Sequence, residues 1–200
     1  TVKDCRINNV GGDGIYIGDR AQNNTIYGND LYHIGFNGIH LNGPNDAYVN
    51  KQNTVMNNRV RYIGMFEGGK GGIAIWQSGE NVISHNKVSD TPRYSIILSS
   101  PRLGASIGQT FNGITITQDN IQQVKRNALN AKDNIIEYND LSNANTDSQD
   151  TGVFYTWGAS AGGNIVRNNE IHDSNIQFSF GYGLYLDDCA DDFQVYNNII

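Results

Sequence analysis

The chain has few basic residues and no long apolar run. Lys and Arg number 14 against 20 Asp and Glu, which gives a net charge of −6. This balance argues against nucleic acid or an anionic membrane as a partner, because both attract basic surfaces. A strongly polyanionic substrate is disfavoured too, unless a metal or a local basic patch compensates. No run approaches the roughly 18 apolar residues of a membrane span, so we expect no membrane insertion.

Apolar residues are also scarce, at 38% of the chain, and only 3 of the 200 residues are proline, whereas 23 are glycine. This content is low for a globular core, but it suffices for a thin core that runs through a stack of repeats. The length fits one domain of ordinary size.

What the chain has in excess is a repeated phrase: an aliphatic residue, two spacers, an asparagine, a spacer and another aliphatic residue. Such a repeat indicates a stacked architecture. Asparagine suits the tight turn because it tolerates left-handed backbone, and stacked amides can bond from one repeat to the next. The asparagines are Asn29, Asn58, Asn86, Asn139, Asn169 and Asn198, and Cys5 takes this place in a first copy.

A second phrase, Gly-Ile-x-Ile or close variants, alternates with the first. Its period of two is typical of a strand with one buried face, so each repeat contains three short strands. The two phrases predict an all-β parallel β-helix of about six to seven rungs, with one long excursion near 99–133. An antiparallel sandwich would need hairpin turns every ~8–12 residues, and the long same-sense period disfavours it.

Alternation predicts which side chains of the second phrase face the core. The inward positions are Ile15, Ile39, Ile73, Ile96, Val153 and Leu184, with Ile17, Leu41, Ile75, Leu98, Tyr155 and Leu186 beside them. The outward positions are Tyr16, His40, Ala74, Ile97, Phe154 and Tyr185.

Three further expectations follow from the stack. In the excursion, Asp119 caps a short helix whose Ile121, Val124, Ala128 and Leu129 share one face. Cys5 and Cys189 lie several rungs apart, beyond the ~7 Å Cα separation that a disulfide allows, so we expect two buried, unpaired thiols. The chain begins and ends inside a repeat phrase and shows no signal peptide, so we expect residues 1–200 to be a β-helix segment of a longer protein.

Loops of variable length flank the second phrase on both sides, and insertions in repeat proteins often surround the binding face. We therefore expect a groove over the outer surface of these strands. Aromatic rings with scattered polar groups suit sugars, because rings stack on C–H faces and polar groups bond hydroxyls. The predicted sugar-binding residues are His40, Asn42, Trp76, Tyr94, Trp157 and Tyr185.

Two carboxylate clusters adjoin this groove. Asp150 precedes the fifth strand of the second phrase, and Asp187 and Asp188 end the sixth. Glycoside hydrolysis usually needs two carboxyl groups, about 5–9.5 Å apart. However, Asp150 and Asp187 could lie nearly 20 Å apart along the strands, at ~3.3 Å per residue. Glu67 is a reserve for the second carboxylate.

Structural roles are open alternatives for several of these carboxylates. An ion pair between Asp150 and Arg93 is an equally good interpretation. The run of Asp188, Asp191 and Asp192 is either a solvated acidic turn or, less favoured, part of a structural calcium site.

The two phrases resemble right-handed parallel β-helix repeats over essentially the whole chain. Stretches 72–97, 150–158, 164–173 and 182–198 are similar to β-helix glycoside hydrolases of the α-L-fucosidase/xylanase type, and to archaeal disaggregatases. The resemblance implies that Asp150 and either Asp187 or Asp188 are the catalytic pair. The Gly-Arg that often closes the first motif is absent, since Ala159 follows Gly158.

The leading hypothesis is an extracellular, cofactor-independent glycoside hydrolase that cleaves a complex polysaccharide. One alternative is a polysaccharide lyase, for which Arg93, Arg102 and a cation in the acidic turn are the relevant features. The other is a non-catalytic glycan-binding β-helix of the tailspike or adhesin type.

Overall fold

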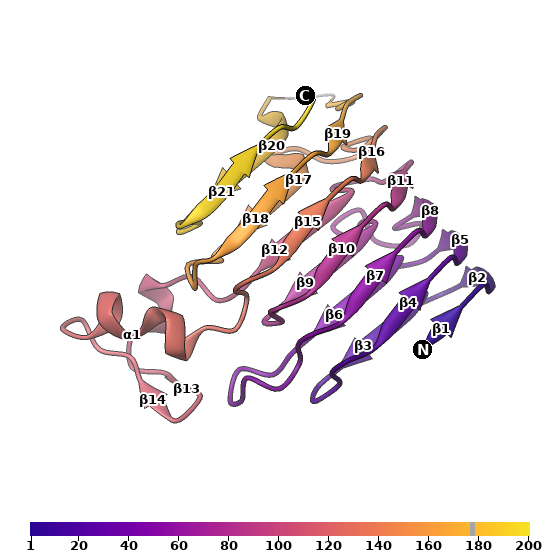
Figure 1. Cartoon of the computed structure of the whole chain (residues 1–200). Helices are drawn as coiled ribbons and strands as arrows, with labels where there is room; N and C mark the ends of the chain where they lie inside the picture. The colour runs from indigo at the N-terminus through magenta and orange to yellow at the C-terminus, as the bar shows by residue number, and fades with distance from the viewer. Residues whose placement is uncertain (177–178) are drawn as a thin grey trace.

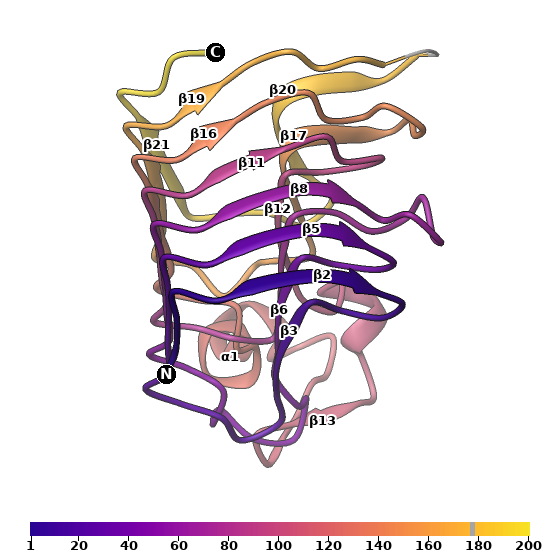
Figure 2. The same cartoon turned by 90° about the vertical axis from the view of Figure 1, so that its right-hand side faces the viewer.

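Successive laps of the chain run in the same direction, and each strand pairs in parallel with the strand one lap away. The computed structural model describes residues 1–176 and 179–200 and shows three parallel sheets wound into one coil (Figures 1 and 2). Each lap, or rung, contributes one strand to each sheet, which confirms the predicted parallel β-helix. The antiparallel sandwich is thereby excluded.

The sheets are named here A, B and C in the order in which a rung passes through them. Sheet A holds β1 (Val2–Lys3), β4 (Thr25–Tyr27), β7 (Thr54–Met56), β10 (Val82–Ser84), β15 (Ile135–Glu137), β18 (Asn164–Arg167) and β21 (Phe193–Tyr196). Sheet B holds β2 (Arg6–Val10), β5 (Asp30–Ile34), β8 (Arg59–Ile63), β11 (Lys87–Ser89), β16 (Asp140–Leu141) and β19 (Glu170–Ile171). Sheet C holds β3 (Ile15–Gly18), β6 (Ile39–Asn42), β9 (Ile73–Trp76), β12 (Ile96–Ser99), β17 (Thr151–Trp157) and β20 (Gly181–Asp187).

The repeated asparagines form a hydrogen-bonded ladder at the corner between sheets A and B. The Asn58 side chain donates to Asn86 Oδ1 at 2.9 Å and accepts from the backbone and side chain of Asn29 at 3.0 and 2.9 Å. The left-handed residue is the one before each asparagine, such as Asn57 with φ 60° and His85 with φ 55°. The predicted amide stacking is confirmed, but the turn conformation was assigned to the wrong residue.

A second asparagine ladder lies at the corner between sheets C and A, and the repeat phrase did not predict it. Asn81, for example, donates its side-chain amide to Asn134 Oδ1 at 2.8 Å and accepts the backbone N–H of Asn53 at 2.9 Å. Members of this ladder stand five residues before members of the first. They are Asn24, Asn53, Asn81, Asn134 and Asn164.

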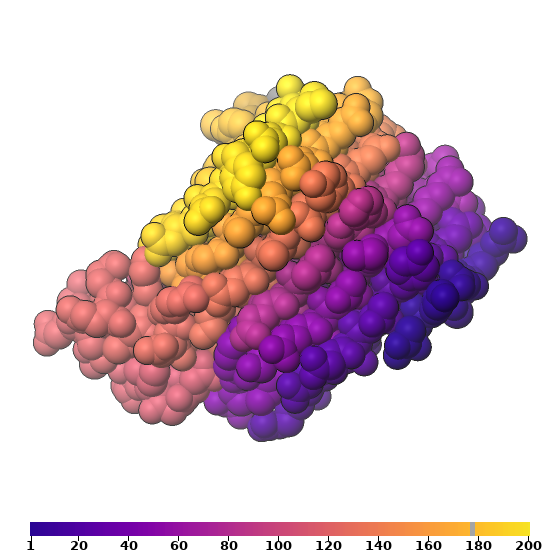
Figure 3. Space-filling model, viewed as in Figure 1, coloured from indigo at the N-terminus to yellow at the C-terminus, as the bar shows by residue number. Residues whose placement is uncertain are grey.

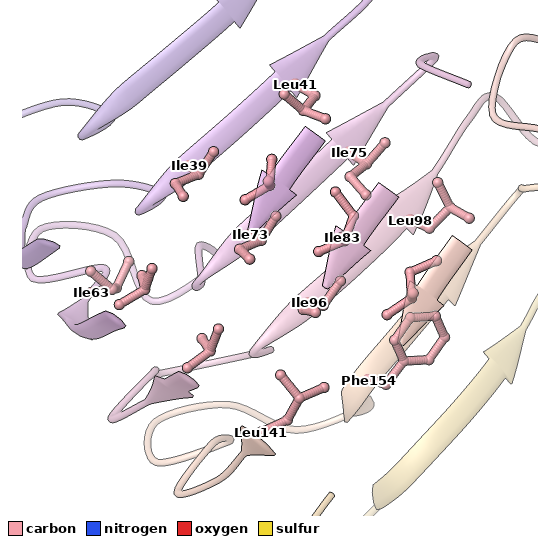
Figure 4. Packing of buried hydrophobic residues seen from close by; sticks show 14 of the residues in the cluster. Ile39, Leu41, Ile63, Ile73, Ile75, Ile83, Ile96, Leu98, Leu141 and Phe154 are labelled. Carbon is pink, nitrogen blue, oxygen red and sulfur yellow. The ribbon is translucent and has the colours of Figure 1, made fainter. Parts of the chain in front are cut away.

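The core is a set of apolar columns inside the coil, and Figure 4 shows several of its side chains together. One rung departs from the predicted alternation. Phe154 pairs with Ile96 and is fully buried, pointing into the core, whereas Tyr155 pairs with Ile97 on the outer face. The assignment of Tyr155 as inward and Phe154 as outward was therefore wrong.

The glycine that opens the second phrase allows the chain to turn closely against its neighbours. A Cβ added to Gly72 would lie 2.1 Å from Val88 Cγ1 and 2.5 Å from the carbonyl oxygen of Ser95. Any larger side chain would collide with the core and with the next rung. This close approach explains why the phrase begins with glycine.

The long excursion between β12 and β15 forms a small unit at one end of the sheet C strands and projects from the stack (Figures 1 and 3). It contains η1 (Gly104–Ser106), β13 (Thr110–Phe111), β14 (Ile114–Thr115) and α1 (Ile121–Ala128). The helix is confirmed, but the residue before it is Asn120, without a side-chain cap, so Asp119 is not the cap. No helix in residues 1–176 and 179–200 is long and apolar enough to cross a membrane.

Both cysteines are unpaired, but they are exposed, so the expectation of buried thiols was wrong. We expect both Cys5 and Cys189 to react with an aromatic disulfide reagent in the native protein, because exposed thiols are accessible without unfolding. Absorbance of the released thiolate should report two thiols per chain before denaturant is added. A count that rises only on unfolding would contradict the exposed placement.

Candidate functional site

The outer face of sheet C carries two parallel columns of side chains that run along the stack axis. Neighbouring members are one rung apart, about 4.8 Å. The first column is Tyr16, His40, Ala74, Ile97, Tyr155 and Tyr185. The second, two residues further along each strand, is Gly18, Asn42, Trp76, Ser99, Trp157 and Asp187.

Two of the predicted sugar-binding residues meet within the second column. Trp76 and Trp157 lie two rungs apart, and their ring centroids are 6.2 Å apart with an interplanar angle of 30°. The strand between them presents Ser99 in the same column, and its small side chain bonds the Ile75 carbonyl oxygen. The two indoles therefore form one continuous aromatic surface.

Tyrosines adjoin this aromatic surface. In the first column Tyr185 is partly exposed, whereas Tyr155 is only 5% exposed and supports the face from beneath. The ring centroids of Tyr155 and Tyr185 are 5.5 Å apart, and those of Tyr182 and Tyr185 are 4.5 Å apart. Tyr155 replaces Phe154 as the outward residue of its rung, so the sequence missed it as a site residue. Its outward position could have been found only from the register of β17.

Asp187 lies at the edge of this aromatic group. It pairs in register with Trp157, and its Oδ2 accepts a 2.8 Å hydrogen bond from the Tyr155 hydroxyl. Burial and the interaction with Asp187 raise the pKa of Tyr155. Burial and Asp187 likewise raise the pKa of Tyr185 to about 12. Both phenols therefore stay protonated at neutral pH and can donate hydrogen bonds.

Asp188 is turned toward the excursion. Its Oδ2 lies 2.5 Å from Arg102 Nε, and the same guanidinium lies 5.1 Å from the centroid of a Trp157 ring. Asp187 and Asp188 therefore both lie near Trp157. Asp187 is its register neighbour on the adjacent strand, and Asp188 pairs with Arg102, whose guanidinium lies beside the Trp157 ring. Arg102 and the Asp188 carboxylate are 86 residues apart, so their pairing could not be predicted from the sequence.

Asp150 lies at the opposite end of the strands from Asp187. Thr151 pairs with Gly181, whereas Trp157 pairs with Asp187, so about 20 Å of strand separates the two carboxylates at ~3.3 Å per residue. Arg93 Nη2 donates to the backbone carbonyl oxygen of Asp150 at 3.1 Å. The structure shows no direct contact between Asp150 and Asp187, although burial and both carboxylates raise the pKa of Tyr185. Toward Asp150, Arg93 contacts the backbone rather than the carboxylate.

The remaining predicted residues take different positions. Tyr94 is buried, 5% exposed, and donates its hydroxyl to Asn37 Oδ1 at 3.1 Å, so it supports the face rather than lining it. His40 and Asn42 are partly exposed on the lower rungs. Glu67, in the loop between β8 and β9, pairs with Lys70 Nζ at 3.4 Å.

The acidic turn after β20 is bonded to cationic side chains. Lys125 of α1 bonds Asp191 and lies 3.5 Å from Asp192, in addition to the pair between Arg102 and Asp188. In residues 1–176 and 179–200, no three His, Cys, Asp or Glu side chains gather as a metal site. These contacts favour the acidic turn as an anchor for the excursion over a calcium site.

A hollow of about 390 Å³ lies elsewhere, between Val10, Gly35, Met65 and Phe66. Its lining is mainly apolar and contains none of the carboxylates described above. We place the candidate site on sheet C instead, because carboxylates, phenols and indoles converge there.

Three parallel sheets wound into one coil define the protein as a β-helix solenoid. A family model described as "Right handed beta helix region" matches residues 1–200, and the chain belongs to this family. No curated protein and no solved structure matches the chain. The family fixes the fold and its hand, whereas function must be argued from the site.

Proposed function

We propose that this protein binds a polysaccharide along the outer face of sheet C and hydrolyses it with Asp187 and Asp188. The observation that carries the proposal is the convergence of these two carboxylates on Trp157. Asp187 is its register neighbour, and Asp188 reaches it through Arg102. Aromatic rings with apolar faces and polar edges suit sugars, which are amphipathic in the same way.

Hydrolysis of a glycosidic bond requires one carboxyl group that protonates the leaving oxygen and another that acts as a base or nucleophile. Asp188, paired with the permanent cation of Arg102, suits the second role, which needs an ionised carboxylate. Asp187 is the candidate for the first role because of its position in the second column, beside Trp157. The two residues are adjacent in the chain, and their carboxylates turn to different partners, Tyr155 for Asp187 and Arg102 for Asp188.

Non-catalytic glycan binding is the second candidate function. The observation that favours it is the separation of Asp150 from Asp187, because the resemblance implied that these two act as a pair. For the lyase alternative, Arg102 is engaged by Asp188 and Arg93 by the Asp150 backbone, which makes either a weaker candidate for proton abstraction. An extracellular location belongs to the proposal, since such polymers surround cells.

The test is the release of reducing ends from soluble xylan, glucomannan and fucose-containing polysaccharides by purified protein. We expect hydrolysis of at least one of them, which would exclude the non-catalytic alternative. Products that absorb in the ultraviolet because they contain a new double bond would instead support a lyase. Binding without any product at high protein concentration would overturn the hydrolase proposal.

Trp157→Ala should weaken binding of the same polysaccharide at least roughly 10-fold, because truncating an aromatic residue at the centre of a binding surface costs about 2 kcal/mol or more, and about 1.4 kcal/mol is tenfold. Retardation in native gels that contain the polysaccharide measures this effect. Tyr138→Ala is the matched control, since Tyr138 stacks on His85 at the corner between sheets A and B. Equal retardation of the two variants would contradict a role for Trp157 in binding.

A further inference from the structure

A second polar cluster lies on the outer face of sheet C, on the rungs of β3 and β6. Asp13, just before β3, is its centre. Its Oδ1 accepts the backbone and side-chain N–H groups of Asn37 at 2.9 and 3.0 Å, and its Oδ2 lies 2.9 Å from His40 Nδ1. Asn37 is held in turn by the hydroxyl of Tyr94. Each oxygen of the Asp13 carboxylate thus has a partner, and the group is fixed in place.

These contacts determine which nitrogen of His40 faces outward as an acceptor. Burial alone would raise the pKa of Asp13, but hydrogen bonds from His40 and Asn37 outweigh burial and lower it. An ionised carboxylate only accepts hydrogen bonds, so the neutral imidazole must carry its proton on Nδ1. Nε2 is then left as an acceptor, oriented by Asp13.

Tyr16 completes the cluster. Its ring meets the His40 ring edge to face, with centroids 5.3 Å apart, and 53% of its surface is exposed. Its hydroxyl oxygen accepts a 2.6 Å bond from Asn42 Nδ2, so the phenol hydrogen can donate outward. An exposed ring, a donor and an acceptor on neighbouring rungs match the C–H face and the hydroxyl groups of a sugar.

We propose that Tyr16, His40 and Asn42 form a distal sugar subsite, so that the substrate is a long neutral polysaccharide lying along the stack axis and cut within its chain. The inference rests on the proposed function, because it uses Asp187 as the point of cleavage. His40 and Tyr185 occupy the same column four rungs apart, about 19 Å at the spacing of parallel strands.

The aromatic side chains of Trp76, Trp157 and Tyr185 lie on the rungs between the subsite and Asp187 or on the rung of Asp187 itself. A sugar unit in an extended polymer is comparable in length to one rung, so only a chain of several units contacts both ends. The charge of Asp13 and the net charge of −6 favour a neutral sugar over a uronate in this subsite.

Binding is tested by native gel retardation in xylan, glucomannan or galactan, with polygalacturonate and alginate as acidic probes. The Asp187→Asn background prevents digestion of the probe. We expect retardation by at least one neutral polymer, weakened several-fold by Tyr16→Ala or His40→Ala. His85→Ala and Tyr138→Ala, another neighbouring His–Tyr pair, are the matched controls and should change nothing. Unchanged retardation in Tyr16→Ala and His40→Ala, or retardation by acidic polymers only, would overturn the subsite.

Steady-state kinetics distinguish a loss of polymer binding at this subsite from a loss of catalysis. Tyr16→Ala and His40→Ala should raise KM for the polymer and leave kcat nearly unchanged, and the first products should be long fragments. Early release of single sugars would overturn cleavage within the chain. If hydrolysis survives in the variant that combines Asp187→Asn with Asp188→Asn, the proposed catalytic pair fails, while the gel result still decides the subsite.

Asp13 positions the His40 ring, and the protonated nitrogen of that ring can be measured separately. In Asp13→Asn the amide can donate to His40 Nδ1, which moves the ring proton to Nε2 and removes the outward acceptor. Nitrogen NMR of the histidine rings should show His40 protonated on Nδ1 in the original chain and on Nε2 in the variant, with weaker retardation by the neutral polymer. A His40 ring already protonated on Nε2 in the original chain would overturn the assignment.

Discussion

Asp187→Asn should lower kcat for polysaccharide hydrolysis at least about 100-fold, because a positioned acid or base contributes roughly 10² to 10⁴ to rate. The asparagine keeps the size of the side chain and can still accept the hydrogen bond from Tyr155, so the aromatic surface around it should persist. Binding of the polymer should therefore change little. Initial rates of reducing-end release, compared with gel retardation of the same variant, measure the two effects separately.

Asp150→Asn is the informative control for this experiment. The resemblance to glycoside hydrolases implies that Asp150 is catalytic, whereas the register of β17 and β20 puts it about 20 Å along the strands from Asp187. We expect its kcat to stay within about twofold of the original value, as for a group outside the reaction centre. A large loss with Asp150→Asn and none with Asp187→Asn would reverse the assignment.

The repeat made the fold predictable, because one asparagine phrase and one glycine phrase together encode a rung. The register of β17 was not predictable in the same way. Alternation sets register only when one face of a strand is buried and the other is exposed. In β17 every residue from Thr151 to Thr156 is buried, because Tyr94 and Tyr185 help to cover its outer face. Alternation therefore predicted Phe154 on the outer face and Tyr155 in the core, which is the reverse of the structure.

The candidate site was predictable in its residue types more than in its geometry. The sequence identified Asp187, Asp188, Trp76 and Trp157 as neighbours. In the structure Trp76, Trp157 and Asp187 share one column on the outer face of sheet C, and Asp188 follows Asp187 and pairs with Arg102. The sequence could not show that Arg102 of the excursion reaches Asp188, since the path of a 35-residue insertion is not encoded in the repeat. The second asparagine ladder could not be predicted either. Its members stand five residues before those of the first ladder, but only the structure shows that they lie at the corner between sheets C and A.

Asn58→Ala should lower the free energy of unfolding by about 3–5 kcal/mol, the upper part of the range for single substitutions. The Asn58 side chain accepts two hydrogen bonds from Asn29 and donates to Asn86 and to the carbonyl oxygen of Ile26. Alanine removes all of them. It leaves the backbone N–H of Asn29 buried without its acceptor, which costs more than the loss of an exposed bond.

The backbone N–H of Cys5, in the first copy of the phrase, donates to Asn29 Oδ1 in the same way. Asn58 lies between two rungs and must serve both. Thermal and denaturant unfolding, followed by circular dichroism, should show the large loss for Asn58→Ala. The exposed helix residue Asn127, changed to alanine, should stay within about 0.5 kcal/mol of the original chain. A loss below about 1 kcal/mol for Asn58→Ala would mean that strand packing, and not the amide ladder, holds the rungs together.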